Sequence, residues 1–406
     1  MDNVTHALIG VLLARAALPW VGSLRGALWA ALLASEAPDI DLVLSPFFED
    51  TRLGYLVHHR GHTHTLVGAA LLALVCAAFA RWRAPEARTV PLLGLALGAA
   101  LLHVGADAWN NYGVHPFWPF ENAWHYGDMI FILEPLLWLA LLPLAFTTSL
   151  RRGARLGVGA LGLALASVTA IGLGPLSGVA WALGAMGLVG LQARWDRLWV
   201  PAGVTAAVLL SFGAASRVAD AGLRARFTTQ RPGELLLDVV LTPRPATPWC
   251  WQGFVLSRDT TTYHARSVLF SLAPGLTPPR DCAVLPVAAR TAPMVPPDLS
   301  SDAATAWGDR FEAPSGELAA LAGEQCRVDA FLRFARAPFW EDDGERIIVG
   351  DLRFDFEQGL SFAEILTTRT LPADTHGCDH LPPWRSVPVR ALLEAGRGGA
   401  RRRPER

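Results

Sequence analysis

Histidine and aspartate recur at the ends of long apolar segments in the first half of this chain. They form five polar clusters, at residues 2–6, 39–41, 58–64, 103–107 and 128. An ionisable side chain at membrane depth costs so much free energy that it is normally paired and faces the interior of a helix bundle. The clusters therefore predict that several membrane helices bring their polar ends together at one site.

The excess of apolar residues lies almost entirely before residue 216. Of the 406 residues, 52% are hydrophobic and 17% are charged, which is more apolar than an ordinary soluble domain. A helix needs about 20 apolar residues to cross a bilayer. The apolar runs predict eight spans, at residues 4–19, 26–44, 65–80, 91–109, 129–147, 156–174, 178–193 and 199–215.

The connections between these spans predict their orientation. If the first five spans alternate in direction, all five polar clusters lie at one face of the membrane. The connections at the opposite face carry most of the arginines, namely Arg15, Arg25, Arg81, Arg83, Arg88, Arg151, Arg152, Arg155, Arg194 and Arg197. Because arginine-rich connections stay in the cytoplasm, we expect the clusters at the outer face of the membrane. An even number of spans places the C-terminal region there too.

The N-terminus is expected to be retained. Asp2 stands where a cleavable signal peptide would carry positive charge, and no small-residue cleavage site follows it.

The chain changes character after residue 215, where proline and charged residues become frequent. Stretches at 234–241, 263–271 and 345–354 are typical of β-strands. We therefore predict an all-α polytopic membrane bundle of about eight spans over residues 1–215. A smaller β-rich or α+β extracytoplasmic domain is expected over 216–396, followed by a basic disordered tail over 397–406. The net charge of −1 predicts no nucleic-acid partner.

Cysteine usage leaves two alternatives open. Cys76 lies inside a predicted span, and the C-terminal region contains the other four, Cys250, Cys282, Cys326 and Cys378. In an oxidising compartment these four can form two disulfides in three possible pairings, and unpaired structural thiols are the alternative.

The first two clusters each contain a pair of polar residues. Asp2 and His6 are four residues apart and share a helix face, so they can supply a ligand and its partner; the alternative is a helix cap followed by a solvated histidine. Asp39 and Asp41 follow Pro38 and can both reach a metal only if the local backbone is not helical. A helix C-terminus disfavours acids, which supports a functional role for this pair.

The segment "HHRGHTH" is the densest cluster, with His58, His59, His62 and His64 within seven residues. Imidazole is a common ligand of zinc, and a glycine inside the segment allows the backbone to turn so that several rings converge. Not all four histidines need to be ligands. Arg60 can stabilise an anionic substrate or pair with an aspartate.

The segment "HVGADAWNNYG" places His103 and Asp107 four residues apart, so both lie on one helix face with Asn110 or Asn111 beyond them. A buried histidine–aspartate hydrogen bond explains the first two residues but not the asparagines. Asp107 can be a direct ligand or the general base that activates water.

The next loop is less informative. His115 and His125 are expected to be solvated, and the aromatic rings around them are expected to anchor the chain at the membrane interface. Asp128 and Glu134 are candidates for acids that support the metal ligands from outside.

Four ordered motifs, "MDNVTHALIG", "APDIDL", "HHRGHTHT" and "HVGADAWNNYG", resemble the YdjM-like family of inner-membrane, metal-dependent hydrolases. The match covers residues 1–140, and Glu134 stands where the family pattern leads us to expect an aspartate. "PRPATPWCWQGF" and "DLRF" look like the C-terminal extension of longer members. The family pattern falls on Asp2, Thr5, His6, Asp39, Asp41, His59, Arg60, Gly61, Thr63, His64, His103, Asp107, Tyr112 and Gly113.

The resemblance implies a hydrolase that holds one or more divalent metal ions, zinc or else manganese. The expected ligands are His6, Asp39, Asp41, His59, His64, His103 and Asp107, with Asp107 and Arg60 as catalytic residues. The expected substrate is a phosphoester or a lipid-linked molecule at the membrane surface. The alternatives are a metal-binding or transport protein without hydrolysis, and a structural membrane protein whose C-terminal domain binds an unknown protein partner.

Overall fold

The computed structural model describes residues 1–44, 51–149, 151–195, 197–284, 290–357, 359, 361–368 and 383–400. Contacts within the chain divide it into two units. The first unit consists of residues 1–40, 62–116 and 129–214, and the second of residues 41–61, 117–128 and 215–406. Two short segments from the N-terminal half therefore fold with the C-terminal region.

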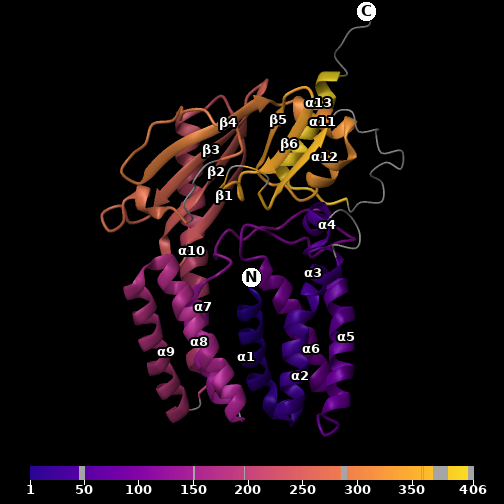
Figure 1. Ribbon diagram of the computed structural model, residues 1–406, viewed down its shortest axis with the longest axis vertical. Coiled ribbons are helices and arrows are strands. Elements are labelled where there is room, and N and C mark those ends of the chain that lie inside the picture. The colour runs from indigo at the N-terminus through magenta and orange to yellow at the C-terminus, as the bar shows by residue number, and fades with distance from the viewer. Residues whose placement is uncertain are drawn as a thin grey trace, which may run out of the picture. The chain divides into compact units, whose positions relative to one another are not determined.

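The first unit is helical, as predicted. Its elements are α1 (Asn3–Val21), α2 (Leu24–Glu36), η1 (Ala37–Ile40), η3 (His62–His64), α5 (Leu66–Arg83), α6 (Thr89–Asp107), α7 (Pro135–Thr148), α8 (Arg152–Leu173), α9 (Pro175–Trp195) and the first part of α10 (Trp199–Gln230). Helices α1, α2, α5 and α6 pack on one another, and α7, α8 and α9 form a second group that contacts α1 through α7 (Figure 1).

The number of spans requires a correction. Among the described residues, six helices are long and apolar enough to cross a membrane, namely α1, α5, α6, α8, α9 and α10. Helices begin near all eight predicted spans, but α7 has only 14 residues and α2 only 13. The predicted span over residues 26–44 stops at Glu36, and Pro38 has no N–H group with which to continue the hydrogen bonds of the α-helix. The chain continues there as the 3-10 turn η1.

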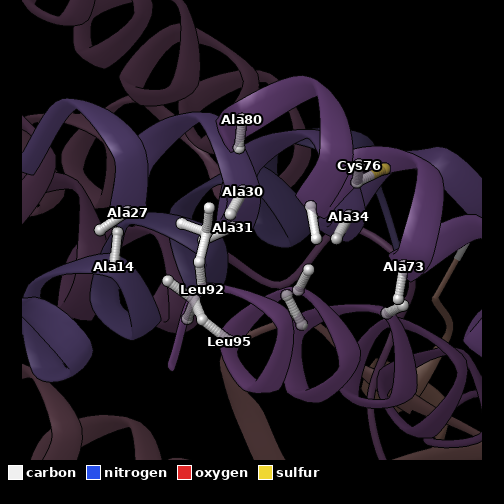
Figure 2. Packing of buried hydrophobic residues seen from close by; sticks show 14 of the residues in the cluster. Ala14, Ala27, Ala30, Ala31, Ala34, Ala73, Cys76, Ala80, Leu92 and Leu95 are labelled. Atoms are coloured by element: carbon white, nitrogen blue, oxygen red, sulfur yellow. The ribbon is translucent and has the colours of Figure 1, made fainter. Parts of the chain in front are cut away.

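Small residues allow the first four helices to approach closely. The buried core between them is largely alanine, with Ala27, Ala30, Ala31 and Ala34 on one face of α2 (Figure 2). A side-chain Cβ at Gly10 would lie 2.9 Å from the Ser35 hydroxyl, so α1 and α2 meet at a position where only glycine fits without a shift. Close backbone approach through small residues is the usual way in which membrane helices associate.

The second unit contains two antiparallel sheets, which confirms the prediction of a β-containing C-terminal domain. The first sheet has the order β1-β2-β3-β4 and the second β5-β6-β7. The strands are β1 (Leu235–Arg244), β2 (Thr247–Arg258), β3 (Thr262–Ser271), β4 (Thr305–Pro314), β5 (Pro338–Asp342), β6 (Arg346–Asp351) and β7 (Glu364–Thr368). The unit also contains the helices α3 (Asp41–Leu44), α4 (Thr51–His58), α11 (Glu317–Glu324), α12 (Cys326–Phe331) and α13 (Val387–Ala400) and the turn η4 (Pro279–Cys282).

One apolar core holds α10 to the first sheet of this unit. Leu223 and Phe227 of α10 pack with Trp251, Val255 and Val268 from β2 and β3. Helix α13 continues to Ala400, inside the tail that the sequence predicts to be disordered from residue 397, and residues 401–406 lie outside the described residues.

A disulfide joins Cys250 of β2 to Cys282 of η4. Cys326 is disulfide-bonded as well, whereas Cys378 lies outside the described residues, so the rest of the pairing stays a prediction. Cys76 is a free, buried cysteine, in agreement with its place inside α5. Disulfides persist mainly in oxidising compartments.

We expect the Cys250→Ala/Cys282→Ala variant to lose roughly 2–4 kcal/mol of stability, because a disulfide restricts the unfolded chain. Urea denaturation in detergent measures the loss, and mass spectrometry of unreduced tryptic peptides should show the two segments linked. The Cys76→Ala variant should keep the linked peptide. An unlinked pair in protein isolated without reductant would contradict the bond.

Candidate metal centre

Three elements of the first unit bring two histidines and two aspartates together. His64 ends the turn η3, His103 and Asp107 lie one turn apart near the end of α6, and Asp39 lies in η1. All four residues are buried or nearly so, and one ligand atom from each lies within 4.8 Å of the others. These four residues are called the metal cluster below.

The shortest contacts in the metal cluster involve the two imidazoles. The Nε2 atoms of His64 and His103 lie 3.1 Å apart. His64 Nε2 lies 3.1 Å from Asp107 Oδ2 and 3.4 Å from Asp39 Oδ1. His103 Nε2 lies 3.5 Å and 3.7 Å from the same two oxygens. Two nitrogens and two carboxylate oxygens therefore converge on one small volume.

The tautomer of His103 follows from its second nitrogen. His103 Nδ1 lies 2.6 Å from the carbonyl oxygen of Ser35, which can only accept a hydrogen bond. Nδ1 therefore carries a proton, and Nε2 is the nitrogen that faces His64 and the two carboxylates. A backbone carbonyl that holds the far nitrogen of a histidine is the usual support of a metal ligand.

The carboxylate of Asp39 is oriented by a residue that the sequence did not single out. Asn3 Nδ2 donates to Asp39 Oδ2 at 2.8 Å and to Glu36 Oε2 at 3.0 Å. Asp39 Oδ1 is therefore the oxygen that faces the histidines. Asn3 lies in the first turn of α1 and is part of the "MDNVTH" motif, but its contact with η1 has no signature in the spacing of the motif.

His6 contacts the metal cluster from α1. Its Nε2 lies 3.3 Å from Asp107 Oδ1, and its ring stacks on His103 with centroids 3.8 Å apart. The amino group of Met1 contacts the same Asp107 oxygen. Asp107 thus uses Oδ1 for these contacts and Oδ2 for His64 and His103. The alternative of a solvated His6 is wrong, because the ring is buried at 1% exposure.

Asp2 caps α1. Its Oδ1 accepts a hydrogen bond from the Thr5 backbone N–H at 3.0 Å, and its Oδ2 accepts one from the Thr5 hydroxyl at 2.6 Å. Trp138 Nε1 donates to the Thr5 hydroxyl oxygen at 3.1 Å. The helix-cap alternative for Asp2 is thus confirmed, and the cap ties the start of α1 to α7.

The turn that carries His64 depends on glycine and threonine. The Thr65 hydroxyl donates to the carbonyl oxygen of His62 at 2.8 Å and accepts from the Gly68 N–H at 2.9 Å. A Cβ at Gly68 would lie 2.1 Å from the same carbonyl oxygen, so no other residue fits there unless the turn moves.

Three other residues that the sequence predicts for the site, Asp41, His59 and Arg60, lie together in the second unit. Asp41 Oδ1 lies 3.0 Å from His59 Nδ1, and Asp41 Oδ2 accepts from the Arg60 backbone N–H at 2.9 Å. Tyr55 stacks on His59, with centroids 4.9 Å apart. Arg60 has a left-handed backbone with φ of 59°, and a Cβ at Gly61 would lie 2.4 Å from the His58 carbonyl oxygen. Metal binding by Asp41 and His59 stays a prediction.

One histidine of the following loop differs from expectation. His115 is fully buried, so its predicted solvation is wrong, whereas His125 is partly exposed and lies 3.5 Å from Glu121. Glu134 caps α7 by accepting from the Leu136 N–H at 3.0 Å.

Asp128 pairs with a distant arginine of the second unit. Arg336 donates to its two oxygens at 2.7 and 2.9 Å and to Asp238 at 2.8 Å. The guanidinium lies 4.0 Å from the ring centre of Tyr126. Burial raises the pKa of Asp128, and the charge of Arg336 opposes this rise. Asp128 therefore anchors its loop to the second unit and does not support the metal cluster as a free acid.

The donor set of the metal cluster suits a divalent metal ion. Imidazole nitrogen and carboxylate oxygen are common ligands of zinc, and both also bind manganese. A buried arrangement of this kind can hold a metal ion.

Residues 1–178 match the model of the YdjM inner membrane protein family. The chain is also similar to the uncharacterized protein YfhP of Bacillus subtilis, with 31% identity over 146 residues. This match covers 34% of the chain and 44% of the relative, so the chain spans less than half the length of that protein. No solved structure matches the chain significantly. The resemblance to the YdjM family is confirmed over its N-terminal part, and six candidate spans fit a multi-pass inner-membrane protein.

If the metal cluster holds a divalent ion, we expect the Gly68→Ala variant to bind zinc, used as the probe, roughly tenfold more weakly or worse, because the new methyl group displaces the turn that holds His64. The matched control is Gly98→Ala in α6, where a Cβ meets nothing within 4 Å. Competition with a chelating dye in detergent measures the affinity. Equal affinities of the two variants would contradict the role of this turn.

Arg336→Gln should destabilise the protein by roughly 3–5 kcal/mol, because it leaves buried carboxylates without their cation. The control is Arg346→Gln, whose ion pair with Asp343 is exposed and should leave stability close to that of the unmodified chain. Urea denaturation in detergent compares the two. If Arg336→Gln lost only a little stability, water would have to reach the Asp128 carboxylate and solvate its charge.

Proposed function

We propose that the chain is a metal-dependent hydrolase of the inner membrane that acts on a phosphoester or a lipid-linked substrate. The observation that carries this proposal is the convergence of two imidazole nitrogens and two carboxylate oxygens within 4.8 Å, buried in a helical unit with several apolar spans. Ionisable groups are rarely placed in such surroundings unless they bind or react. The match to the YdjM family adds support.

Zinc is the metal we propose, with manganese as the alternative. Catalytic zinc sites combine three protein ligands with one open position. Asp39, His64 and His103 can supply three ligands, and Asp107 then remains as a fourth ligand or as the general base. Bound metal would lower the pKa of water and polarise a phosphoryl oxygen.

The roles of Asp107 and His6 follow from their contacts. Asp107 Oδ2 faces the two imidazoles, where it can accept a proton from an attacking water molecule. Its Oδ1 lies 3.3 Å from His6 Nε2, so His6 can hold the carboxylate in place and take part in proton movement away from it. His6 can also be a further ligand, as the sequence predicts.

Arg60 is proposed to stabilise the negative charge of a phosphoester. Its backbone N–H donates to Asp41, which holds the residue in a left-handed conformation beside His59. A guanidinium binds two phosphate oxygens at once, which a lysine cannot do in the same geometry. The proposed ligands Asp41 and His59 would bind metal near this residue.

The proposed orientation places the metal cluster and the C-terminal domain on the periplasmic side. The arginine-rich connections support a cytoplasmic position for the opposite ends of the helices. The Cys250–Cys282 disulfide supports an oxidising compartment for the C-terminal domain. The proposed partner is a membrane lipid or lipid-linked molecule rather than a nucleic acid.

Elemental analysis and hydrolysis assays test the proposal together. We expect near-stoichiometric zinc or manganese in detergent-purified protein, and a loss of this metal in His64→Ala and His103→Ala. The matched control is His125→Ala, which removes a partly exposed histidine outside the metal cluster. A chelator should abolish hydrolysis of phosphomonoester and phosphodiester lipids in mixed micelles, and added metal should restore it.

Two further variants separate binding from chemistry. Asp107→Asn should lower kcat by roughly 10²–10⁴-fold if the carboxylate is a general base. Arg60→Gln should keep the metal but weaken hydrolysis of anionic substrates. Folded protein without metal would contradict the proposal. Metal without hydrolysis of any phosphoester would instead favour a metal-binding or transport protein.

A further inference from the structure

The hairpin formed by α5 and α6 carries a hollow at its loop end. It belongs to the first unit and has a volume of about 610 Å³. On α5 its lining extends from Leu74 to Trp82, which corresponds to about 12 Å along the helix axis. The metal cluster includes the other end of α6, so this hollow is a separate feature.

The two ends of the hollow differ in chemistry. Its deeper part is apolar and is lined by Leu74, Ala78, Leu92 and Leu93. Its loop end is lined by Arg81 and Thr89. Arg81 Nε donates to the Thr89 hydroxyl at 3.3 Å, and this bond directs the guanidinium from α5 towards α6 at the loop end of the hollow. The terminal nitrogens of the same guanidinium are donors of the kind that bind phosphate.

Aromatic residues mark this end of the helices as the level of the membrane interface. Trp82 lines the hollow and is 68% exposed, and Trp20 at the end of α1 is 64% exposed. The guanidinium of Arg83 lies 5.4 Å from the ring centres of Trp29 and Trp82. Tryptophan and arginine gather where acyl chains meet headgroups. The hollow therefore runs from headgroup level into the apolar layer.

The charge around the loop end of the hollow is positive. Arg25, Arg81, Arg83 and Arg88 lie on or next to the two connections at this end, with Glu86 as the acid among them. Ser23 donates to Glu86 at 2.6 Å, and this bond together with Arg25 and Arg81 lowers the pKa of Glu86. Four arginines outnumber this one carboxylate, so an anionic ligand is favoured over a neutral one. Basic pockets between membrane helices on the cytoplasmic side bind the headgroups of anionic lipids.

We propose that this hollow binds one anionic phospholipid of the cytoplasmic leaflet. Its phosphate accepts hydrogen bonds from Arg81 and Thr89, and an acyl chain lies against Leu74, Ala78 and Leu93. The lipid fills the hollow between the two helices and extends the packing of the hairpin. This binding does not depend on hydrolysis or on metal at the other end of α6.

Native mass spectrometry of the full chain in detergent tests the proposal with phosphatidylglycerol and phosphatidylcholine as the two probes. We expect one retained phosphatidylglycerol per chain and weaker retention of phosphatidylcholine. Arg81→Gln should lower the affinity for phosphatidylglycerol about fivefold, the effect of one arginine near a membrane surface. Ala78→Phe should lower the affinity for both lipids because the ring fills the hollow.

Two control variants change equivalent groups elsewhere. Arg152→Gln removes an exposed arginine at the start of α8, and Ile171→Phe adds an aromatic ring at an apolar position that is 87% exposed. Both should bind phosphatidylglycerol as the unmodified chain does. Circular dichroism and thermal melting in detergent establish that every variant is folded.

Three results would overturn the proposal. The first is equal retention of the two lipids, which indicates non-specific contact. The second is unchanged retention in both Arg81→Gln and Ala78→Phe. The third is a dimer that Ala78→Phe dissociates, because a second copy of the chain would then occupy the hollow.

Discussion

The burial of charged and polar groups among apolar helices is the constraint on which this structure depends. His64, His103, Asp39 and Asp107 are withdrawn from water, and an unpaired charge there would cost several kcal/mol. Their mutual contacts, and the support that Asn3 and Ser35 provide, compensate for that cost. A divalent cation among the two nitrogens and two oxygens would compensate for it further. The same groups that make the cluster costly in a membrane thus make it suitable for metal chemistry.

Small side chains make this arrangement possible. The alanine face of α2 and the absence of a side chain at Gly10 allow α1, α2, α5 and α6 to approach closely (Figure 2). Close approach is what lets a carbonyl oxygen of α2 reach the Nδ1 atom of His103 on α6. Gly68 has the same role at the start of α5, where it leaves room for the carbonyl group of the turn before it. The close packing of the helices and the geometry of the metal cluster therefore depend on the same small residues.

The second unit combines the C-terminal region with two segments from the N-terminal half. The 117–128 segment is attached through the Asp128–Arg336 ion pair and through Trp124, whose Nε1 donates to the Arg333 carbonyl at 2.9 Å. The 41–61 segment, which contains the proposed substrate-binding Arg60, contacts this region through Tyr55 and Phe362. The C-terminal region thus supports loops that carry predicted functional residues. The C-terminal region, which lies beyond the match to the family at residues 1–178, therefore has a physical role in holding those loops.

Local spacing in the sequence was enough to predict where the helices begin and that His103 and Asp107 share one helix face. Residues four apart on a helix share a face, so this pair required no long-range information. The tertiary structure decided which histidine of "HHRGHTH" joins the metal cluster, because a cap by Thr65 and a turn at Gly68 place His64 there. It also decided that Asp128 pairs with Arg336, 208 residues away. Contacts between distant segments depend on how the helices and sheets pack, and spacing along the chain does not record that packing.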